Sequence, residues 1–331
     1  LERGSFPAGA SSKNAGFACF GSLTELASDI KIMGENDVYD LVEQRWRGLS
    51  VLKGLVGTEP IEYQNLGGYE LFTNHDQNSY HSALNLMPKV NAELKTIIGQ
   101  DTFQKADNRI NSFKFRGIEH IIFNQYEAQI NTGKMISRLI TLARESGIEI
   151  INGVTVNHIE DLNTSVEIDT TLGNIKCLQC LIATNGFTKN LLPEIEVEPA
   201  RAQVLITSPI PNLPFRGTFH YNDGYYYFRN VGNRVLFGGG RNLDLVNETT
   251  TEMVLSDLIQ NKLEELLNEV ILPSSAFEIE QRWSGIMGVS GSKKTISRSL
   301  SENVSCAVRL GGMGVAIGSL IGQDAARSIK Y

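Results

Sequence analysis

A glycine-rich segment near the end of the 331-residue chain offers backbone groups that could stabilise an anion. Residues 310–318 read Leu-Gly-Gly-Met-Gly-Val-Ala-Ile-Gly, between an apolar run at 306–310 and an apolar helical pattern that reaches about residue 329. Glycines let N–H groups converge without side chains in the way, and a helix start adds partial positive charge. The segment predicts a nest for negative charge, although a tightly packed turn has the same composition.

The first residues supply a carboxylate followed by a loop of small residues. Leu1-Glu2-Arg3-Gly4 precedes Gly9-Ala-Ser-Ser-Lys-Asn-Ala-Gly-Phe17. In a dinucleotide-binding βαβ unit, an acidic residue at a strand end binds a ribose hydroxyl about 20 residues beyond a Gly-x-Gly-x-x-Gly turn. No such turn precedes Glu2, so we expect the sequence to start inside its nucleotide-binding motif. An ordinary Gly/Ser/Asn loop is the alternative.

Metal and nucleophile chemistry find little support in the sequence. Cys177 and Cys180 have the spacing of half a zinc site, but no second Cys-x-x-Cys or His-x-x-x-His occurs. The pair runs into the apolar 181–184 segment, so we interpret both cysteines as small core residues. The five histidines are isolated, and no Ser/His/Asp arrangement stands out. We expect no metal.

Composition limits the class of protein. The chain has 41% hydrophobic and 20% charged residues, which is typical of a soluble globular protein long enough for two domains. A net charge of −7, without a basic run, argues against a nucleic-acid partner. No apolar stretch approaches the ~18 residues of a membrane helix, and no secretion signal is visible. We therefore expect a cytoplasmic protein without a membrane span.

The apolar spacing predicts the elements that position these segments. Residue patterns predict helices over 38–56, 132–146 and 250–270, and another after 314. Thr132 is expected to cap the second of these helices and Gly147 to end it. Predicted strands occupy 148–151, 154–159, 166–170, 175–184 and several runs within 202–240, with tight turns at 221–224 and 230–233. The region 58–129 is polar and weakly periodic, so it is expected to be rich in loops.

These patterns predict an α/β plus α+β fold with two interleaved domains. Strands and helices alternate at both ends of the chain, around a block of antiparallel strands. We expect a discontinuous, Rossmann-like cofactor domain over 1–57, 130–200 and 279–331. An antiparallel-sheet substrate domain is expected over 58–129 and 201–278.

The chain resembles FAD-dependent oxidoreductases of the D-amino-acid oxidase and glycine oxidase superfamily, particularly gamma-glutamylputrescine oxidase-like members. Members typically read Leu-Glu-Arg/Lys-Gly and then Gly-Ala-Ser-x-Arg/Lys-Asn-Ala/Gly-Gly, as at the start of this chain. The segments at 153–156, 182–186, 283–288 and 310–318 resemble further superfamily markers. The resemblance implies non-covalent FAD, although the phosphate-binding turn is missing. It assigns cofactor contacts to Glu2, Arg3, Ser11, Ser12, Lys13, Asn14, Ala15, Gly16, Phe17, Val156, Ala183, Thr184, Gly186, Gly285, Gly312, Met313, Gly314, Val315 and Ala316.

The resemblance also bears on the substrate. Amino-acid oxidases of this group commonly place an arginine two residues after the glycine at 285, where it clamps the substrate carboxylate. This chain has Met287 there, so a carboxylate would need Arg282, Arg241 or Arg229. In the aromatic run 225–228, alternate residues share a face, so either the pair 225/227 or the pair 226/228 faces the flavin. The substrate-pocket candidates are Tyr226, Tyr227, Arg282 and Met287.

The implied reaction is oxidation of a C–N bond. A hydride would pass from the carbon bearing a neutral amine to flavin N5, the imine would hydrolyse, and oxygen or another acceptor would reoxidise the flavin. Met287 favours an amine or an N-substituted amino acid over a simple D-amino acid, and a homo-oligomer is compatible with the sequence. The alternative is a truncated flavoprotein fold without cofactor that acts in binding or assembly. An NAD(P)H-dependent reductase would need a second nucleotide-binding unit, and the sequence has none.

Overall fold

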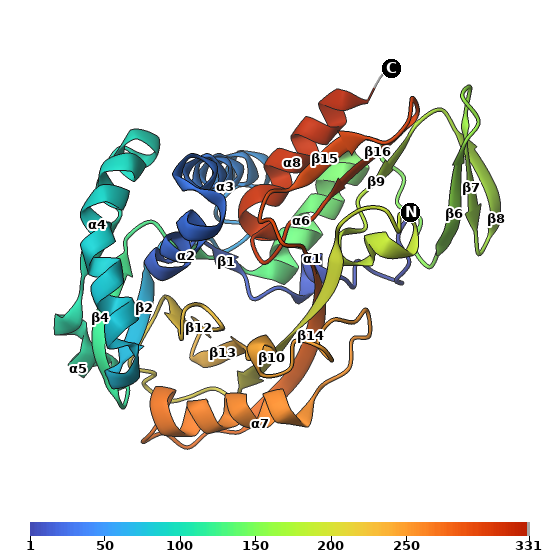
Figure 1. The fold of residues 1–331 in the computed structure, drawn as a ribbon. Coiled ribbons are helices and arrows are strands. Elements are labelled where there is room, and N and C mark those ends of the chain that lie inside the picture. The colour runs from blue at the N-terminus through green and yellow to red at the C-terminus, as the bar shows by residue number, and fades with distance from the viewer. Residues whose placement is uncertain (330–331) are drawn as a thin grey trace.

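A large mixed sheet dominates the computed structural model, which describes residues 1–329 (Figure 1). Its eight strands lie in the order β14-β10-β13-β12-β11-β2-β4-β3, and all neighbours are antiparallel except β11 and β2. The strands are β2 (Gly68–Thr73), β3 (Phe103–Lys105), β4 (Ile118–Asn124), β10 (Glu198–Thr207), β11 (Thr218–Tyr221), β12 (Tyr226–Val231), β13 (Arg234–Gly239) and β14 (Ile279–Val289). The turns predicted at 221–224 and 230–233 join β11 to β12 and β12 to β13.

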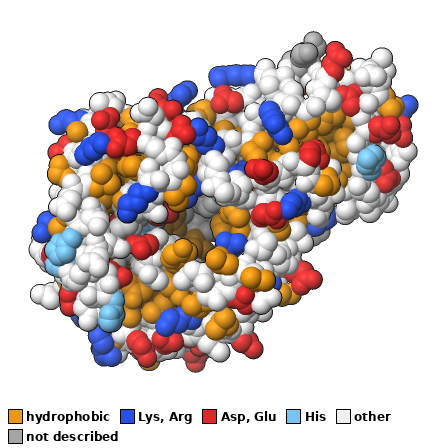
Figure 2. Space-filling view, viewed as in Figure 1, with side chains coloured by type: hydrophobic (Ala, Val, Ile, Leu, Met, Phe, Trp, Pro, Cys, Tyr) orange, Lys and Arg blue, Asp and Glu red, His pale blue; other side chains and the backbone are white. Residues whose placement is uncertain are grey.

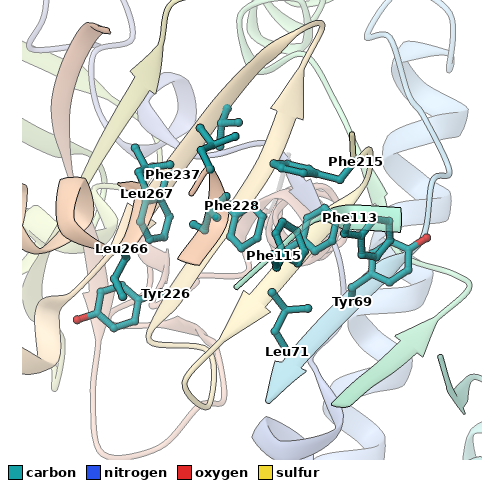
Figure 3. Packing of buried hydrophobic residues seen from close by; sticks show 14 of the residues in the cluster. Tyr69, Leu71, Phe113, Phe115, Phe215, Tyr226, Phe228, Phe237, Leu266 and Leu267 are labelled. Atoms are coloured by element: carbon teal, nitrogen blue, oxygen red, sulfur yellow. The ribbon is translucent and has the colours of Figure 1, made fainter. Parts of the chain in front are cut away.

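An aromatic core covers one face of this sheet. Because side chains alternate along a strand, Tyr226 and Phe228 point together into this core (Figure 3). The Phe228 ring stacks on Phe219 with centroids 4.7 Å apart. Leu263 and Leu266 of helix α7 (Asp257–Leu266) close the core from outside. The opposite face of the sheet is therefore the one free to line a site.

Helix α7 is shorter than predicted. The prediction of a helix over 250–270 is wrong for residues 250–256, which are irregular. The hydroxyl of Thr250 accepts a hydrogen bond from the Glu252 N–H at 3.1 Å, a local bond that competes with helix formation. A π-helical turn, Leu267–Ile271, continues α7.

The prediction that 58–129 is rich in loops is also wrong. This region forms β2, β3, β4, β5 (Ala128–Gln129), the short α5 (Ile110–Phe113) and the 22-residue helix α4 (Gln77–Ile98). Only Tyr80, Ala83, Val90 and Leu94 of α4 are buried, and Pro88 lies inside it. So sparse an apolar stripe gives a weak helical signal in the sequence.

Four helices, three of them packed against α3 (Glu35–Val56), form a second layer. They are α2 (Leu23–Met33), α3 (Glu35–Val56), α6 (Thr132–Glu145) and α8 (Gly314–Ser328). Sequence patterns did not predict α2, although Ser22 and Glu25 form a capping box at its start. In α6 the cap is Asn131 rather than Thr132, and Gly147 follows the helix with φ +78° as predicted.

Three small sheets complete the fold. They contain β1 (Phe17–Ala18) with β5; β15 (Ile296–Ser299), β16 (Val304–Val308) and β9 (Cys180–Ile182); and β6 (Val156–Asp161), β7 (Val166–Thr170) and β8 (Gly173–Cys177). The predicted strand 148–151 is absent: only a parallel bridge between Glu2 and Asn152 occurs there.

The predicted α/β plus α+β fold class is confirmed. Helices accompany both parallel strand pairs (β11 with β2 and β16 with β9) and antiparallel ones. The domain boundaries stay a prediction. No helix within residues 1–329 is both long and apolar enough to cross a membrane.

Candidate active site

A cleft of about 1830 Å³ lies between the N-terminal segment, the glycine loop after β16 and the open face of the large sheet. Figure 2 shows this side of the molecule hollowed near its middle, with hydrophobic side chains around the hollow. Pockets for drug-sized ligands measure roughly 300–1,000 Å³. The cleft therefore has room for a dinucleotide-sized ligand together with a smaller one.

The N-terminal segment forms one wall of the cleft. The Gly4 N–H donates to Glu2 Oε1 at 2.8 Å, and the Glu2 N–H donates to the Ile151 carbonyl. Further on, Asn14 Oδ1 accepts from the Gly16 N–H at 2.9 Å, which closes a turn beside the short α1 (Ala10–Lys13). These local bonds fix the backbone of the loop and leave its cleft-facing side open.

The glycine loop forms the opposite wall. Gly311, with φ +58°, turns the chain from β16 toward α8. The N–H groups of Gly314 and Val315 belong to the first turn of α8 and have no acceptor within that helix. Both residues line the cleft. A helix start with open N–H groups can stabilise negative charge there.

The structure brings together nearly all residues predicted to contact the cofactor. Seventeen of the nineteen line the cleft; Ser12 and Ala316 do not. The Ser12 hydroxyl donates to the Pro7 carbonyl and so acts within the loop. At Ala316 the backbone packs against Gly48 of α3. For the others, cofactor contact stays a prediction supported by position.

Tyr227, rather than Tyr226, faces the cleft. Tyr226 is 3% exposed and belongs to the aromatic core on the other face, which corrects its assignment to the substrate pocket. Tyr227 lines the cleft with Tyr225 and meets Phe17 edge-on at 5.6 Å. Burial raises the pKa of Tyr227 to about 12, so its hydroxyl stays protonated.

Arg282 also lies away from the cleft, which corrects its assignment. It alternates with Gly285 and Met287 along β14, so its side chain points to α7. There it donates to Gln260 Oε1 at 2.8 Å and to Glu264 Oε1 at 2.6 Å. Met287 does line the cleft.

A third arginine considered from the sequence, Arg229, has a structural position. It donates to the carbonyls of Ala15 and Ile130, the latter at 3.0 Å, and is 6% exposed. It therefore ties the N-terminal loop to the sheet. Arg229 is not among the residues that line the cleft.

A buried histidine–carboxylate pair, which sequence spacing did not reveal, reaches the cleft. His220 Nε2 lies 2.9 Å from Glu127 Oε2, and Thr218 donates to the same oxygen at 2.8 Å. His220 lines the cleft and meets Phe17 edge-on. Burial alone lowers the pKa of His220, but the charge and hydrogen bond of Glu127 raise it to about 9. His220 is therefore an imidazolium at neutral pH.

A second buried carboxyl group lies behind this pair. Glu70 accepts hydrogen bonds from the Ser22 hydroxyl at 2.8 Å and from the Thr24 hydroxyl. Burial raises the pKa of Glu70 to about 7, against these hydrogen bonds. A cavity of about 10 Å³ separates Glu70 from Glu127 and His220, roughly the room of one water molecule.

Charged side chains from distant segments gather on the same side of the cleft. Glu25, Arg45 and Lys293 line it. Lys293 Nζ pairs with the buried Asp29 at 2.7 Å. Burial lowers the pKa of Arg45, whereas the carboxylates of Glu25 and Asp29 raise it. No sequence motif links these residues, because they come from α2, α3 and the loop between β14 and β15.

Comparison with known proteins decides the family. The family model for FAD dependent oxidoreductases (DAO) matches residues 1–328. The chain belongs to this family of FAD-dependent oxidoreductases. The resemblance seen in the sequence is thereby confirmed, and FAD is the cofactor of the family.

Individual relatives of this flavoenzyme chain are distant. It is 26% identical over 202 residues to the probable oxidoreductase OrdL of Rhizobium meliloti (strain 1021); the match covers 59% of this chain and 45% of OrdL. Glycine oxidase from Geobacillus kaustophilus superposes with a TM-score of 0.77 and 16% identity, over 100% of this chain and 88% of that one. L-amino acid deaminase from Proteus vulgaris superposes with a TM-score of 0.75 and 14% identity, over 98% of this chain and 86% of that one. These solved structures share the fold.

The cleft residues of this family member fit FAD. A Cβ at Gly285 would lie 2.9 Å from Lys13 Cβ, so the glycine keeps the cleft wall thin where the N-terminal loop crosses β14. At the opposite wall, Gly314 and Val315, whose N–H groups have no acceptor within α8, line the space. Glu2 has one carboxylate oxygen engaged locally by Gly4. These features leave room and polar groups for a flavin dinucleotide, and the contact that each residue makes with FAD stays a prediction.

Proposed function

We propose that the chain oxidises a C–N bond of an amine or an N-substituted amino acid, using FAD. The observation that carries this proposal is Met287, which lines the cleft beside the glycine loop: a Cβ at Gly312 would lie 3.7 Å from its sulfur. A thioether there offers no charge to a carboxylate. The proposal therefore favours substrates that are recognised by an apolar surface near the reacting carbon.

The residues of the chain divide the work of holding both ligands. Glu2 and the loop over 13–17 would hold the dinucleotide, and the N–H groups of Gly314 and Val315 would face its negative charge. When bound, FAD supplies the hydride acceptor. Tyr227, with Phe17 packed edge-on against it, gives the substrate side of the cleft an apolar surface that excludes water from the amine.

His220 and Glu127 give this side of the cleft a fixed polar group. The Nε2 of His220 is held by Glu127, so the ring keeps one orientation toward the cleft. The carboxylate of Glu127 offsets the charge of the imidazolium, so the pair contributes orientation rather than net charge near the amine.

Anaerobic mixing of the purified, FAD-loaded protein with a panel of amines and amino acids tests this proposal. We expect primary and N-alkylated amines to bleach the flavin absorbance and simple D-amino acids to bleach it much more slowly. Bleaching by D-amino acids alone would contradict the proposal. Protein that takes up no FAD on reconstitution would instead support a cofactor-free role in binding or assembly.

A further inference from the structure

Glu25 is an acidic side chain at the wall of the cleft where the substrate is predicted to bind. Within the described part of the chain, only Glu2 and Glu25 bring a carboxylate to the cleft. Glu2 belongs to the N-terminal segment, which is predicted to hold the FAD ribose. Glu25 instead interacts electrostatically with His220, whose ring meets Phe17 edge-on. It therefore lies near the apolar surface that Phe17 forms with Tyr227.

The start of helix α2 fixes one oxygen of this carboxylate. In the capping box, the Ser22 N–H donates to Glu25 Oε2 at 3.0 Å, and the Glu25 N–H donates to the Ser22 hydroxyl at 3.4 Å. The second oxygen, Oε1, accepts no hydrogen bond from the described residues and is not among the buried atoms that lack a partner. It is therefore accessible from the cleft. The cap thus orients the carboxylate and leaves one oxygen open.

The turn between β11 and β12 lies directly against this carboxylate. Gly224 lines the cleft, and a Cβ there would lie 3.2 Å from Glu25 Cδ and 3.4 Å from Oε1. Its φ of +82° also favours glycine. Tyr225 and Tyr227, which line the cleft, follow this turn. The open oxygen therefore lies at the entrance to the aromatic wall.

Cations near Glu25 are engaged elsewhere. Lys293 Nζ pairs with Asp29 at 2.7 Å, and Arg45 Nη1 donates to the Phe20 carbonyl at 2.8 Å. Glu25 itself forms no direct ion pair within the described chain. Burial alone raises the pKa of Glu25, but nearby positive charge, that of Lys293 first, lowers it below its ordinary value. The carboxylate is therefore ionised at neutral pH, and its open oxygen is available to a ligand.

An amine has the chemistry that suits this oxygen. An ionised carboxylate accepts hydrogen bonds and donates none, so its partner must carry N–H or O–H groups. Charge-assisted hydrogen bonds are about twice as strong as neutral ones, and a low local dielectric strengthens them further. The rings of Tyr227 and Phe17 provide such surroundings. The proposed substrate carries its N–H groups next to the reacting carbon.

We propose that Glu25 binds the nitrogen of the amine substrate through Oε1. The N–H of the neutral amine donates to this oxygen. When the C–H bond breaks, the hydride carries both electrons to FAD, and the nitrogen lone pair forms the C=N bond, so the nitrogen becomes positively charged. The carboxylate stabilises this charge as it develops. This inference rests on the proposed amine oxidation.

The kinetic test uses Glu25→Gln. A glutamine is accepted at this position of a capping box, so the substitution removes the charge and keeps the cap. We expect the rate of anaerobic flavin bleaching by saturating pentylamine to fall about 10–100-fold, the usual range for a charge-assisted hydrogen bond. Asp76→Asn is the matched control, because Asp76 has the same place in the capping box of Thr73 but does not line the cleft. Bleaching of Glu25→Gln at the wild-type rate overturns the proposal.

A binding measurement separates this role from the proposed reaction. tert-Butylamine has no hydrogen on the carbon that bears nitrogen and so cannot lose a hydride, and tert-butanol has the same shape without the amine. By calorimetric titration, we expect the FAD-loaded wild-type and Asp76→Asn proteins to bind the amine about 10–100-fold more tightly than the alcohol. Glu25→Gln should bind both about equally.

The outcomes of this titration are distinct. An amine preference that Glu25→Gln retains, or no amine preference in the wild type, overturns the role of Glu25. The wild-type result alone can overturn it, so the test does not depend on how the variant folds. If the preference is present and depends on Glu25 but no amine bleaches the flavin, the amine site stands and the proposed oxidation fails.

Discussion

At the scale of single residues, the site depends on charges buried in pairs. Burial alone lowers the pKa of His220. The pKa is nevertheless raised to about 9, because Glu127 lies 2.9 Å away and Glu25 and Glu70 add negative charge. The pair is 93 residues apart in sequence and meets only because β11 crosses the chain segment next to β5. Such a pair gives the fold a dependence on pH.

We expect the free energy of unfolding to fall as pH rises from about 6.5 to about 9. The folded-state pKa of His220 lies above its ordinary value of 6.5, so its contribution is complete below pH 6.5 and is lost as pH passes the folded value. The loss is on the order of 3 kcal/mol. Urea unfolding at pH 6.5 and 9.5 measures it, and His220→Gln should flatten the difference. An equal pH dependence in that variant would contradict the assignment.

Position 287 offers a second test at this scale. Met287→Arg places a guanidinium in the cleft at the position where amino-acid oxidases with the similar sequence motif commonly have a carboxylate-binding arginine. We therefore expect KM for simple amino acids to fall about tenfold or more. Met287→Leu, which keeps an apolar side chain of similar size, is the control and should leave the amine preference unchanged. Steady-state kinetics on both substrate classes measures the shift. A Met287→Arg protein with wild-type selectivity would remove the main support for the proposed substrate class.

At the scale of elements, the cleft depends on how closely α8 docks on α3. A Cβ at Gly48 would lie 2.0 Å from the Ala316 carbonyl oxygen and 3.0 Å from Ile317 Cα. The glycine therefore lets the two helices touch along their backbones. This contact sets the position of the first turn of α8, which lines the cleft.

Gly48→Ala should accordingly destabilise the protein and weaken FAD binding. Overpacking of this kind costs about 1–3 kcal/mol, which exceeds the gain in helix propensity. Gly54→Ala, on the same helix with nothing within 4 Å of its Cβ, is the matched control for stability and should be neutral or stabilising in urea; it also lines the cleft, so its FAD affinity is not part of the control. Urea unfolding and FAD titration monitored by flavin fluorescence report both effects. Equal behaviour of the two variants would show that the helix contact does not position α8.

At the scale of the whole molecule, the cleft is bounded by segments from every third of the chain. Residues near 2–17, 180–190, 220–245 and 285–323 line it. A ligand that spans these segments binds only the folded state and so stabilises it. The stabilisation is about 2.7 kcal/mol when free ligand is 100 times its Kd.

We therefore expect FAD to raise the thermal unfolding midpoint in a concentration-dependent manner. Adding FMN, which lacks the adenosine half, should raise it less, because it cannot reach the wall around Glu2 and Val156. Differential scanning calorimetry with both nucleotides measures the difference. A midpoint that neither nucleotide changes would mean that these 329 described residues bind no flavin.

Local patterns in the sequence were sufficient for features that depend on backbone chemistry. Glycine spacing predicted the loop before α8, the glycine-containing turns at 221–224 and 230–233 predicted the hairpins, and the order of small residues at 9–17 indicated the family. Period-two alternation also showed that Tyr225 and Tyr227 share a face. Alternation cannot tell which face meets a cleft, because that depends on what packs on the other side.

Tertiary structure alone decided which side chains the site uses. The core beneath α7 buries Tyr226 and engages Arg282, so neither reaches the cleft. Two positive-φ glycines turn Arg241 into it. His220 and Glu127 become a pair only through contacts between distant strands. The physical reason is that burial, charge pairing and desolvation are set by neighbours in space, whereas the sequence lists only neighbours along the chain.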